Sequence, residues 1–286
     1  MLHGLARTPA SLSKMASILE RDGYAVINLG YDSRHAPIET LSAKAVQESL
    51  DACPAENRKI HFVTHSLGGI LLRYYLESNE IPALGRVVML APPNQGSHVV
   101  DVFRHLPGYR LLNGPAGIQL GTGKDSLPLS LGAVNFSLGV IAGNRSINII
   151  LSQFLENPDD GKVSVESTKV EGMCSFIELP VTHALMMRSS TVIEQVQHYL
   201  LEGHFSGEAA INGLCSPGRT SGAGGQLLRQ FSRLRAASAT LANPSRNGLA
   251  GRHSRHFRAV SIHSLALLRV YSRAPDSITM LTMVSS

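Results

Sequence analysis

The sequence contains no tryptophan and only three cysteines among its 286 residues. Cys53, Cys174 and Cys215 are far apart and include no C-x-x-C pair, so their spacing indicates neither a zinc site nor a disulfide framework. The chain also lacks a long uncharged run that could cross a membrane, and its start shows no signal-peptide pattern. These absences favour a reduced, intracellular setting, and we expect a cytoplasmic protein.

Acidic residues and lysine are nearly absent from the last part of the chain. Residues 1–205 carry 16 Lys and Arg against 19 Asp and Glu, a balance of −3, whereas residues 206–286 carry 10 Arg, no Lys and two acidic residues, a balance of +8. The overall charge of +5 therefore comes from this Ser-, Arg- and Gly-rich segment. An arginine-rich RNA-binding segment is one interpretation, but its three widely spaced aromatic residues make no stacking platform. We expect a basic, disordered extension and no role for nucleic acid.

Residues 1–205 alternate strand-like and helix-like segments, which is typical of a mostly parallel sheet with helices on both faces. The apolar patterns predict helices over residues 11–22, 38–53, 70–80 and 190–201, and strands over residues 24–29, 60–64, 86–91, 137–142 and 174–179. A long irregular stretch separates the third strand from the fourth. The sequence therefore predicts an α/β domain over residues 1–205.

A serine stands where the predicted strand 60–64 meets the next helix. At such a sharp corner the side chain of Ser66 is turned away from the backbone, and Gly68 and Gly69 leave room where strand and helix almost touch. The Leu67 amide then lies in the first turn of a helix, where unpaired N–H groups favour a developing negative charge. An exposed hydroxyl beside such an amide suits acyl transfer. A simple helix N-cap serine is the alternative.

The segment Thr64-His-Ser-Leu-Gly68 resembles the nucleophile elbow of the α/β-hydrolase superfamily, specifically of its lipase-like and esterase-like members. Its usual pattern is G-x-S-x-G, and Thr64 occupies the first glycine position, where it crowds the elbow. The segment from Val87 to Ser97 is similar to the segment that follows a strand in bacterial lipase-like proteins. The resemblance covers residues 1–205 and implies a lid or cap over about residues 92–135. A disordered surface excursion is the alternative for that stretch.

The resemblance implies two partners for Ser66, because the family order is serine, acid, histidine. His183 follows the last predicted strand and precedes the last predicted helix, which is the position of the general base; a loop histidine without a role is the alternative. The turn from Asn157 to Ser164 is similar to the D-G-x-V loop that carries the acid. It implies Asp160, and Asp159 remains the competitor.

The start of the chain resembles the loop that completes an oxyanion hole. His3-Gly4-Leu5 is similar to the family's H-G-x loop and implies that the Leu5 backbone N–H joins that of Leu67. Only Met1 and Leu2 remain of the strand that the family has before this loop. The chain therefore looks truncated at its N-terminus, and we expect the Leu5 amide to be poorly anchored.

The hypothesis is a serine hydrolase that cleaves small-molecule or lipid carboxylic esters through an acyl-enzyme, with no metal or organic cofactor. Leu185, Met186 and Met187 line an acyl pocket or pack in the core. Two alternatives stay open: acyl transfer to an alcohol or amine on the same fold, and a catalytically inactive member that binds a lipid or a partner.

Overall fold

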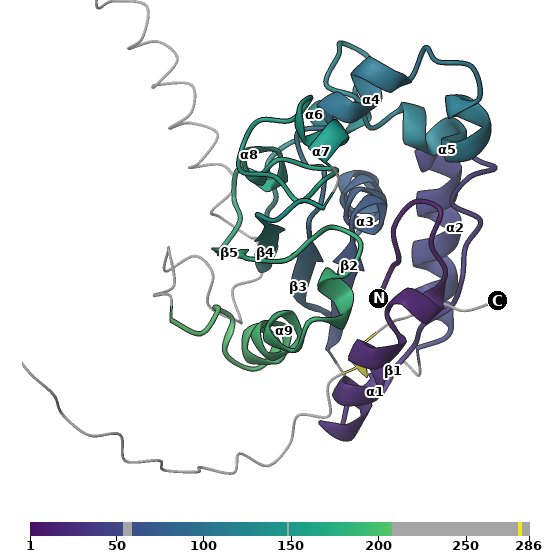
Figure 1. The fold of residues 1–286 in the computed structure, drawn as a ribbon. Helices are drawn as coiled ribbons and strands as arrows, with labels where there is room; N and C mark the ends of the chain where they lie inside the picture. The colour runs from purple at the N-terminus through teal and green to yellow at the C-terminus, as the bar shows by residue number, and fades with distance from the viewer. Residues whose placement is uncertain (54–58, 148, 208–279, 282–286) are drawn as a thin grey trace, which may run out of the picture. The chain divides into compact units, whose positions relative to one another are not determined.

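The computed structural model describes residues 1–53, 59–147, 149–207 and 280–281. Helices and strands alternate along residues 1–207, as the apolar pattern predicted (Figure 1). The predicted basic extension lies outside the described residues apart from residues 206–207 and 280–281.

Six strands form one sheet, and every pairing between neighbours in it is parallel. The strand order is β1-β6-β2-β3-β4-β5. The strands are β1 (Ala25–Val26), β2 (Ile60–His65), β3 (Leu84–Leu90), β4 (Leu138–Gly143), β5 (Ser175–Leu179) and β6 (Met280–Leu281). The sequence predicted the first five to within a few residues. It did not predict β6, whose residues it assigned to the extension.

Helices cover both faces of the sheet (Figure 1). On one face lie α2 (Ile38–Asp51) and α3 (Leu67–Ser78), and on the other lie α1 (Ser13–Arg21) and α9 (Ser190–Glu202). Successive strand residues point to opposite faces, so Val87 and Met89 pack in the α2–α3 core while Val88 and Leu90 pack in the α1–α9 core. Strands buried on both faces explain the nearly continuous apolar runs, and the predicted α/β fold is confirmed.

Short helices fill the stretches between β3 and β5. They are α4 (His98–Phe103), α5 (Tyr109–Ile118), α6 (Leu127–Ser130), α7 (Ile149–Ser152) and α8 (Val165–Thr168), and they gather at one end of the sheet (Figure 1). The sequence predicted an irregular stretch here because glycine and proline interrupt the apolar period. In α5, Gly114 has φ of 65° and is followed by Pro115.

A buried arginine fastens both ends of the predicted lid segment to α3. The guanidinium of Arg73 donates to the carbonyl oxygen of Asn94 at 3.1 Å, and to those of Leu131 and Gly132 at 3.2 and 3.0 Å. Burial lowers the pKa of Arg73 to about 10, so it keeps its charge at neutral pH. The segment between Asn94 and Leu131 therefore leaves and rejoins the fold beside α3.

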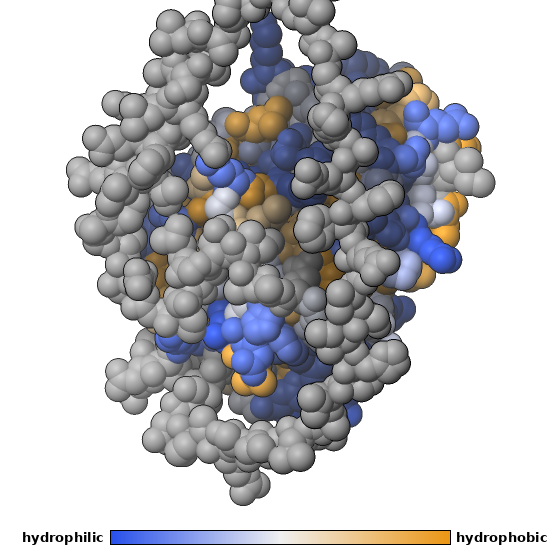
Figure 2. All heavy atoms as spheres, turned by 90° about the vertical axis from the view of Figure 1, so that its left-hand side faces the viewer, coloured by the Kyte–Doolittle hydropathy of each residue, from blue (hydrophilic) through white to orange (hydrophobic). Residues whose placement is uncertain are grey.

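Large apolar side chains are exposed over this segment and its neighbours. They are Val102, Leu106, Leu111, Leu112, Leu129, Ile147, Ile150 and Phe154. The coloured part of the face in Figure 2 carries both hydrophilic and hydrophobic residues. None of the described helices combines the length and apolar character needed to cross a membrane.

Cys174, directly before β5, is disulfide-bonded in the structure. The spacing of the cysteines did not indicate this bond, because pairing depends on which cysteines the fold brings together. The bond removes the argument from cysteine usage for a reducing compartment.

Candidate active site

Ser66 forms the corner between β2 and α3, as the sequence predicted. Its backbone has φ of 53° and ψ of −121°, a left-handed φ that non-glycine residues rarely adopt. The strain is held in place because the Ser66 N–H donates to the Leu90 carbonyl at 2.9 Å, and the Ser66 carbonyl accepts from the Gly69 N–H at 3.0 Å. The side chain is thereby fixed at the end of β2, with 8% of the residue exposed.

The elbow depends on a glycine at position 68. A Cβ atom built on Gly68 would lie 2.4 Å from the Leu2 carbonyl oxygen, so any side chain at position 68 would collide with the backbone of Leu2. Thr64, at the unusual first position of the motif, is fully buried, and its Oγ1 has no hydrogen-bond partner among the described residues. The threonine therefore fits the elbow, but with an unpaired hydroxyl.

The two predicted partners of the serine lie in contact with each other. His183 Nδ1 is 2.7 Å from Asp160 Oδ2, and both side chains are almost completely buried. The other carboxylate oxygen, Oδ1, accepts the backbone N–H groups of Lys162 and Val163 at 3.0 and 2.9 Å. These two donors orient the carboxylate so that its second oxygen meets the imidazole. The backbone N–H of His183 also donates to the backbone carbonyl of Asp160 at 3.0 Å.

Asp159, the competitor for the acid, has other partners. Its Oδ1 accepts from Ser152 Oγ at 2.9 Å and from the Gly161 N–H at 2.7 Å. The Asp159 side chain thus closes the turn within residues 157–164, the acid loop. The contact with His183 is made by Asp160.

The loop with the predicted oxyanion donor lies beside the serine. Leu2 pairs with β2 on both sides of Thr64: its N–H donates to the Val63 carbonyl at 3.0 Å, and its carbonyl accepts the His65 N–H at 2.9 Å. A Cβ atom built on Gly4 would lie 3.1 Å from Ser66 Cβ. The backbone of the His3 loop therefore runs against the nucleophile elbow.

The segment after β1 holds the same loop from its other side. The Tyr31 hydroxyl donates to the His3 carbonyl, the two rings stack with centroids 4.1 Å apart, and Ser33 Oγ accepts the Ala6 N–H at 2.9 Å. The expectation that Leu5 would be poorly anchored is therefore wrong, because Tyr31 and Ser33 hold the loop on either side of it. No motif in the sequence indicated these contacts, since Tyr31 and Ser33 match none.

Two backbone donors near Ser66 are unpaired. Leu67 is the first residue of α3, where N–H groups have no acceptor within the helix. Within the described ranges of the chain, neither the Leu5 N–H nor the Leu67 N–H has a hydrogen-bond acceptor. Both are free to bind an oxygen of a substrate.

Ser66 and His183 are linked through His65. The rings of His65 and His183 are 4.8 Å apart between centroids, and His65 Nε2 lies 3.1 Å from the His183 carbonyl oxygen. The Asp160–His183 pair therefore contacts His65, the neighbour of Ser66 in the chain. No direct hydrogen bond joins His183 to the Ser66 hydroxyl among the described residues.

Other residues near the histidine fall into two groups. Met186 and Met187 are buried in the α1–α9 core, while 55% of Leu185 is exposed. The predicted lid also reaches the site, because a Cβ atom built on Gly117 in α5 would lie 2.9 Å from Leu5 Cδ2. Of Leu185, Met186 and Met187, Leu185 alone is exposed enough to contact a ligand.

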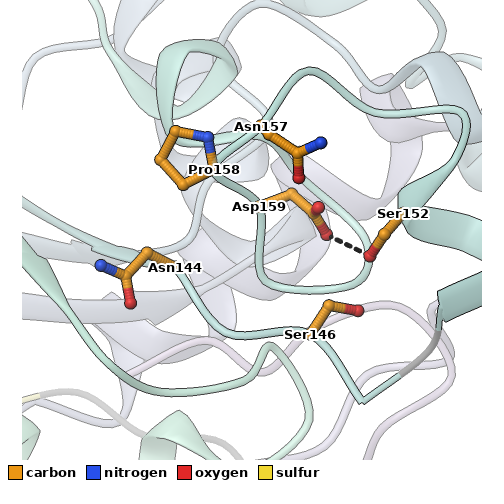
Figure 3. A pocket seen from close by; sticks show the side chains of 6 residues that line it. All are labelled: Asn144, Ser146, Ser152, Asn157, Pro158 and Asp159. Carbon is orange, nitrogen blue, oxygen red and sulfur yellow. Dashed lines mark hydrogen bonds between the residues drawn. The ribbon is translucent and has the colours of Figure 1, made fainter.

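A pocket of about 550 Å³ lies beside the acid loop (Figure 3). It is lined by Asn144, Ser146, Ser152, Asn157, Pro158 and Asp159. None of Ser66, Asp160 or His183 lines it, so this pocket is separate from the candidate active site. The described residues contain no group of three or more His, Cys, Asp or Glu suited to a metal ion.

Comparisons with known proteins match this chain through its fold. No protein-family model and no curated protein matches it. The phospholipase PlaB from Legionella pneumophila superposes with a TM-score of 0.53 at 17% identity, over 84% of this chain and 64% of that one. The mature Bacillus licheniformis lipase BlEst2 gives 0.48 at 16% identity, over 65% and 84%.

This chain thus spans less than two thirds of the phospholipase's length. The parallel sheet with helices on both faces and the superposition on this phospholipase show that the chain has the α/β-hydrolase fold.

Proposed function

We propose that this protein is a serine hydrolase that cleaves carboxylic esters through an acyl-enzyme, with Ser66 as nucleophile, His183 as base and Asp160 as the acid that orients it. The observation that carries the proposal is the buried contact between His183 Nδ1 and Asp160 Oδ2 at 2.7 Å, held next to the strained Ser66 corner. A serine hydroxyl, a histidine and a carboxylate that orients the histidine are the three groups that this kind of nucleophilic catalysis requires.

In the first half of the reaction, His183 Nε2 takes the proton from Ser66 Oγ as this oxygen attacks the acyl carbon. Asp160 keeps the other ring proton on Nδ1 and stabilises the imidazolium that forms. His183 then gives its proton to the oxygen of the departing alcohol, and the acyl group stays on Ser66. In the second half, His183 deprotonates a water molecule, whose oxygen attacks the acyl carbon. The bond between this carbon and Ser66 Oγ then breaks, His183 returns the proton to Ser66 Oγ, and the acid is released.

The negative charge of each tetrahedral intermediate lies on the former carbonyl oxygen. The unpaired N–H groups of Leu5 and Leu67 are the proposed donors to it, and each is worth about 3 to 4 kcal/mol of transition-state stabilisation. The hydrogen bonds from Tyr31 and to Ser33 keep the Leu5 loop rigid. A donor held in place before the reaction needs no reorganisation when the charge develops.

The apolar surface of the predicted lid supports an ester with an apolar acyl group. Leu111 and Leu112 in α5 are 84% and 65% exposed, and α5 packs against Leu5. The matched structures are described as a phospholipase and a lipase, which is in keeping with a lipid or small-molecule ester as the substrate.

A fluorophosphonate probe, which reacts with activated serine hydroxyls, tests the proposal on the full chain. We expect the wild type to be labelled, Ser66→Ala to be unlabelled, and the control Ser126→Ala, which removes a buried helix-capping serine elsewhere, to be labelled like the wild type. Labelling that persists in Ser66→Ala would exclude Ser66 as nucleophile. A wild type that folds and is never labelled would favour a binding protein instead.

Nitrophenyl esters of increasing acyl length then measure turnover and preference. The same assay with added alcohols or amines separates hydrolysis from acyl transfer, because transfer gives a new ester or amide in place of the free acid.

A further inference from the structure

The histidine before the nucleophile, His65, makes a specific contact with the candidate base. It is the last residue of β2, only 1% exposed, and its Nε2 lies 3.1 Å from the backbone carbonyl oxygen of His183. Among the described residues, this is the one hydrogen bond that joins residues 180–185 to β2 or α3. The other polar contacts of His183 run to Asp160.

The chemistry of this contact defines the proton positions on His65. A carbonyl oxygen only accepts, so Nε2 must carry a proton and donate it. Nδ1 is buried and has no partner in the described part of the chain, so it carries none. It faces the His3 loop, since a Cβ atom built on Gly4 would lie 2.8 Å from Nδ1. The opposite tautomer would turn a lone pair toward the carbonyl oxygen.

The surroundings of His65 keep it neutral. Burial lowers its pKa well below 6.5, and the neighbouring His183, Arg7 and Lys162 lower it further because all are basic. A second proton would lie on Nδ1, against Gly4 and without an acceptor. His65 is therefore a neutral donor with a single defined tautomer.

We propose that His65 is a positioning residue whose Nε2–H holds the His183 backbone against the nucleophile elbow. The inference rests on the proposed function. Asp160 fixes the orientation of the imidazole, and its loop is tied to the segment after β3 by the bond from Ser97 Oγ to the Lys162 carbonyl at 2.7 Å. The His65 contact is the bond that joins the backbone of His183 itself to β2, directly beside Ser66. Without it, the distance between the serine hydroxyl and the base becomes variable.

Three variants of the full chain test this role. His65→Phe keeps a ring of similar size and removes the donor, so the His183 carbonyl loses its partner. His65→Gln restores an N–H donor at about the same distance along the side chain. His61→Phe is the matched control, since His61 is a buried histidine of the same strand whose contact runs to the Arg86 N–H, away from Ser66.

Displacement of a reacting group by about 1 Å can reduce the rate by two orders of magnitude. We therefore expect His65→Phe to lose roughly 10- to 100-fold in kcat and in the rate of fluorophosphonate labelling, with KM changed less than about threefold, because substrate binding does not use this contact. His65→Gln should recover kcat to within about threefold of the wild type. His61→Phe should lower Tm and leave kcat unchanged.

The downfield proton resonance of His183 Nδ1–H gives a second readout, and we expect it to broaden in His65→Phe and stay sharp in His65→Gln. Wild-type kcat in His65→Phe, or an equal loss in both His65 variants, would overturn the positioning role and leave a space-filling one. Should His65→Phe fail to unfold cooperatively, His65→Asn, whose amide is too short to reach the carbonyl, replaces it. A wild type without labelling would overturn the proposed function itself, and the role of His65 with it.

Discussion

Replacing the proposed acid by its amide separates geometry from chemistry at this site. Asp160 Oδ1 accepts two backbone N–H groups, from Lys162 and Val163, while Oδ2 meets His183 Nδ1. In Asp160→Asn the amide oxygen must take the Oδ1 position, because an NH₂ group there would face two donors. The NH₂ group is then turned toward His183 and donates to Nδ1. The imidazole proton is forced onto Nε2, the atom that must accept the serine proton.

The expected loss follows from this reversed tautomer. A base with the wrong tautomer costs a factor on the order of 10⁴ in kcat, or about 5.5 kcal/mol of activation free energy. The fold should change little, because Asn and Asp have the same shape and the two loop amides keep their acceptor. The kcat for a short nitrophenyl ester, together with Tm, measures both quantities.

The neighbouring carboxylate provides the matched control. Asp159→Asn alters the bonds to Ser152 and Gly161 and leaves His183 untouched. We expect a loss of about 1 to 2 kcal/mol in the free energy of unfolding and a kcat within a few-fold of the wild type. More than a tenth of wild-type kcat in Asp160→Asn, or a larger kcat loss in Asp159→Asn, would refute the assignment.

Two further predictions concern the stability contributed by buried polar side chains. Thr64→Val replaces an unpaired buried hydroxyl by a methyl group and should raise the free energy of unfolding by about 1 to 2 kcal/mol, measured by urea titration. The control Thr168→Val removes a 2.7 Å hydrogen bond to the Val165 carbonyl and should lower the free energy of unfolding in the same titration. Burial lowers the pKa of His3 and His65 and, with the nearby cations, that of His61 to about 3. Unfolding then takes up protons below about pH 6.5, so stability should be lost as pH falls, by about 1.4 kcal/mol per pH unit for a histidine that stays neutral in the fold. His61, with its pKa near 3, stays neutral over this range, so His61→Phe should reduce the slope by about 1.4 kcal/mol per pH unit. Equal unfolding free energies at pH 7 and pH 5 would contradict the reasoning.

The order of elements and the corner at Ser66 were readable from the sequence because they depend on neighbouring residues. An apolar strand, a small-residue turn and an apolar helix follow each other within residues 60–78, so the local pattern was sufficient to predict the elbow. The short helices of the lid segment were not predicted, since glycine and proline break their pattern and their stability comes from packing and from Arg73.

Contacts between distant residues were decided only by the tertiary structure. The resemblance to the D-G-x-V loop implied Asp160 and left Asp159 as a competitor, and the turn of the acid loop determines that Asp160 meets His183. The anchoring of Leu5 by Tyr31, the contact of His65 with the His183 carbonyl and the insertion of β6 beside β2 likewise join segments far apart in the chain. No periodicity encodes such pairings, because each depends on where the sheet brings two loops together.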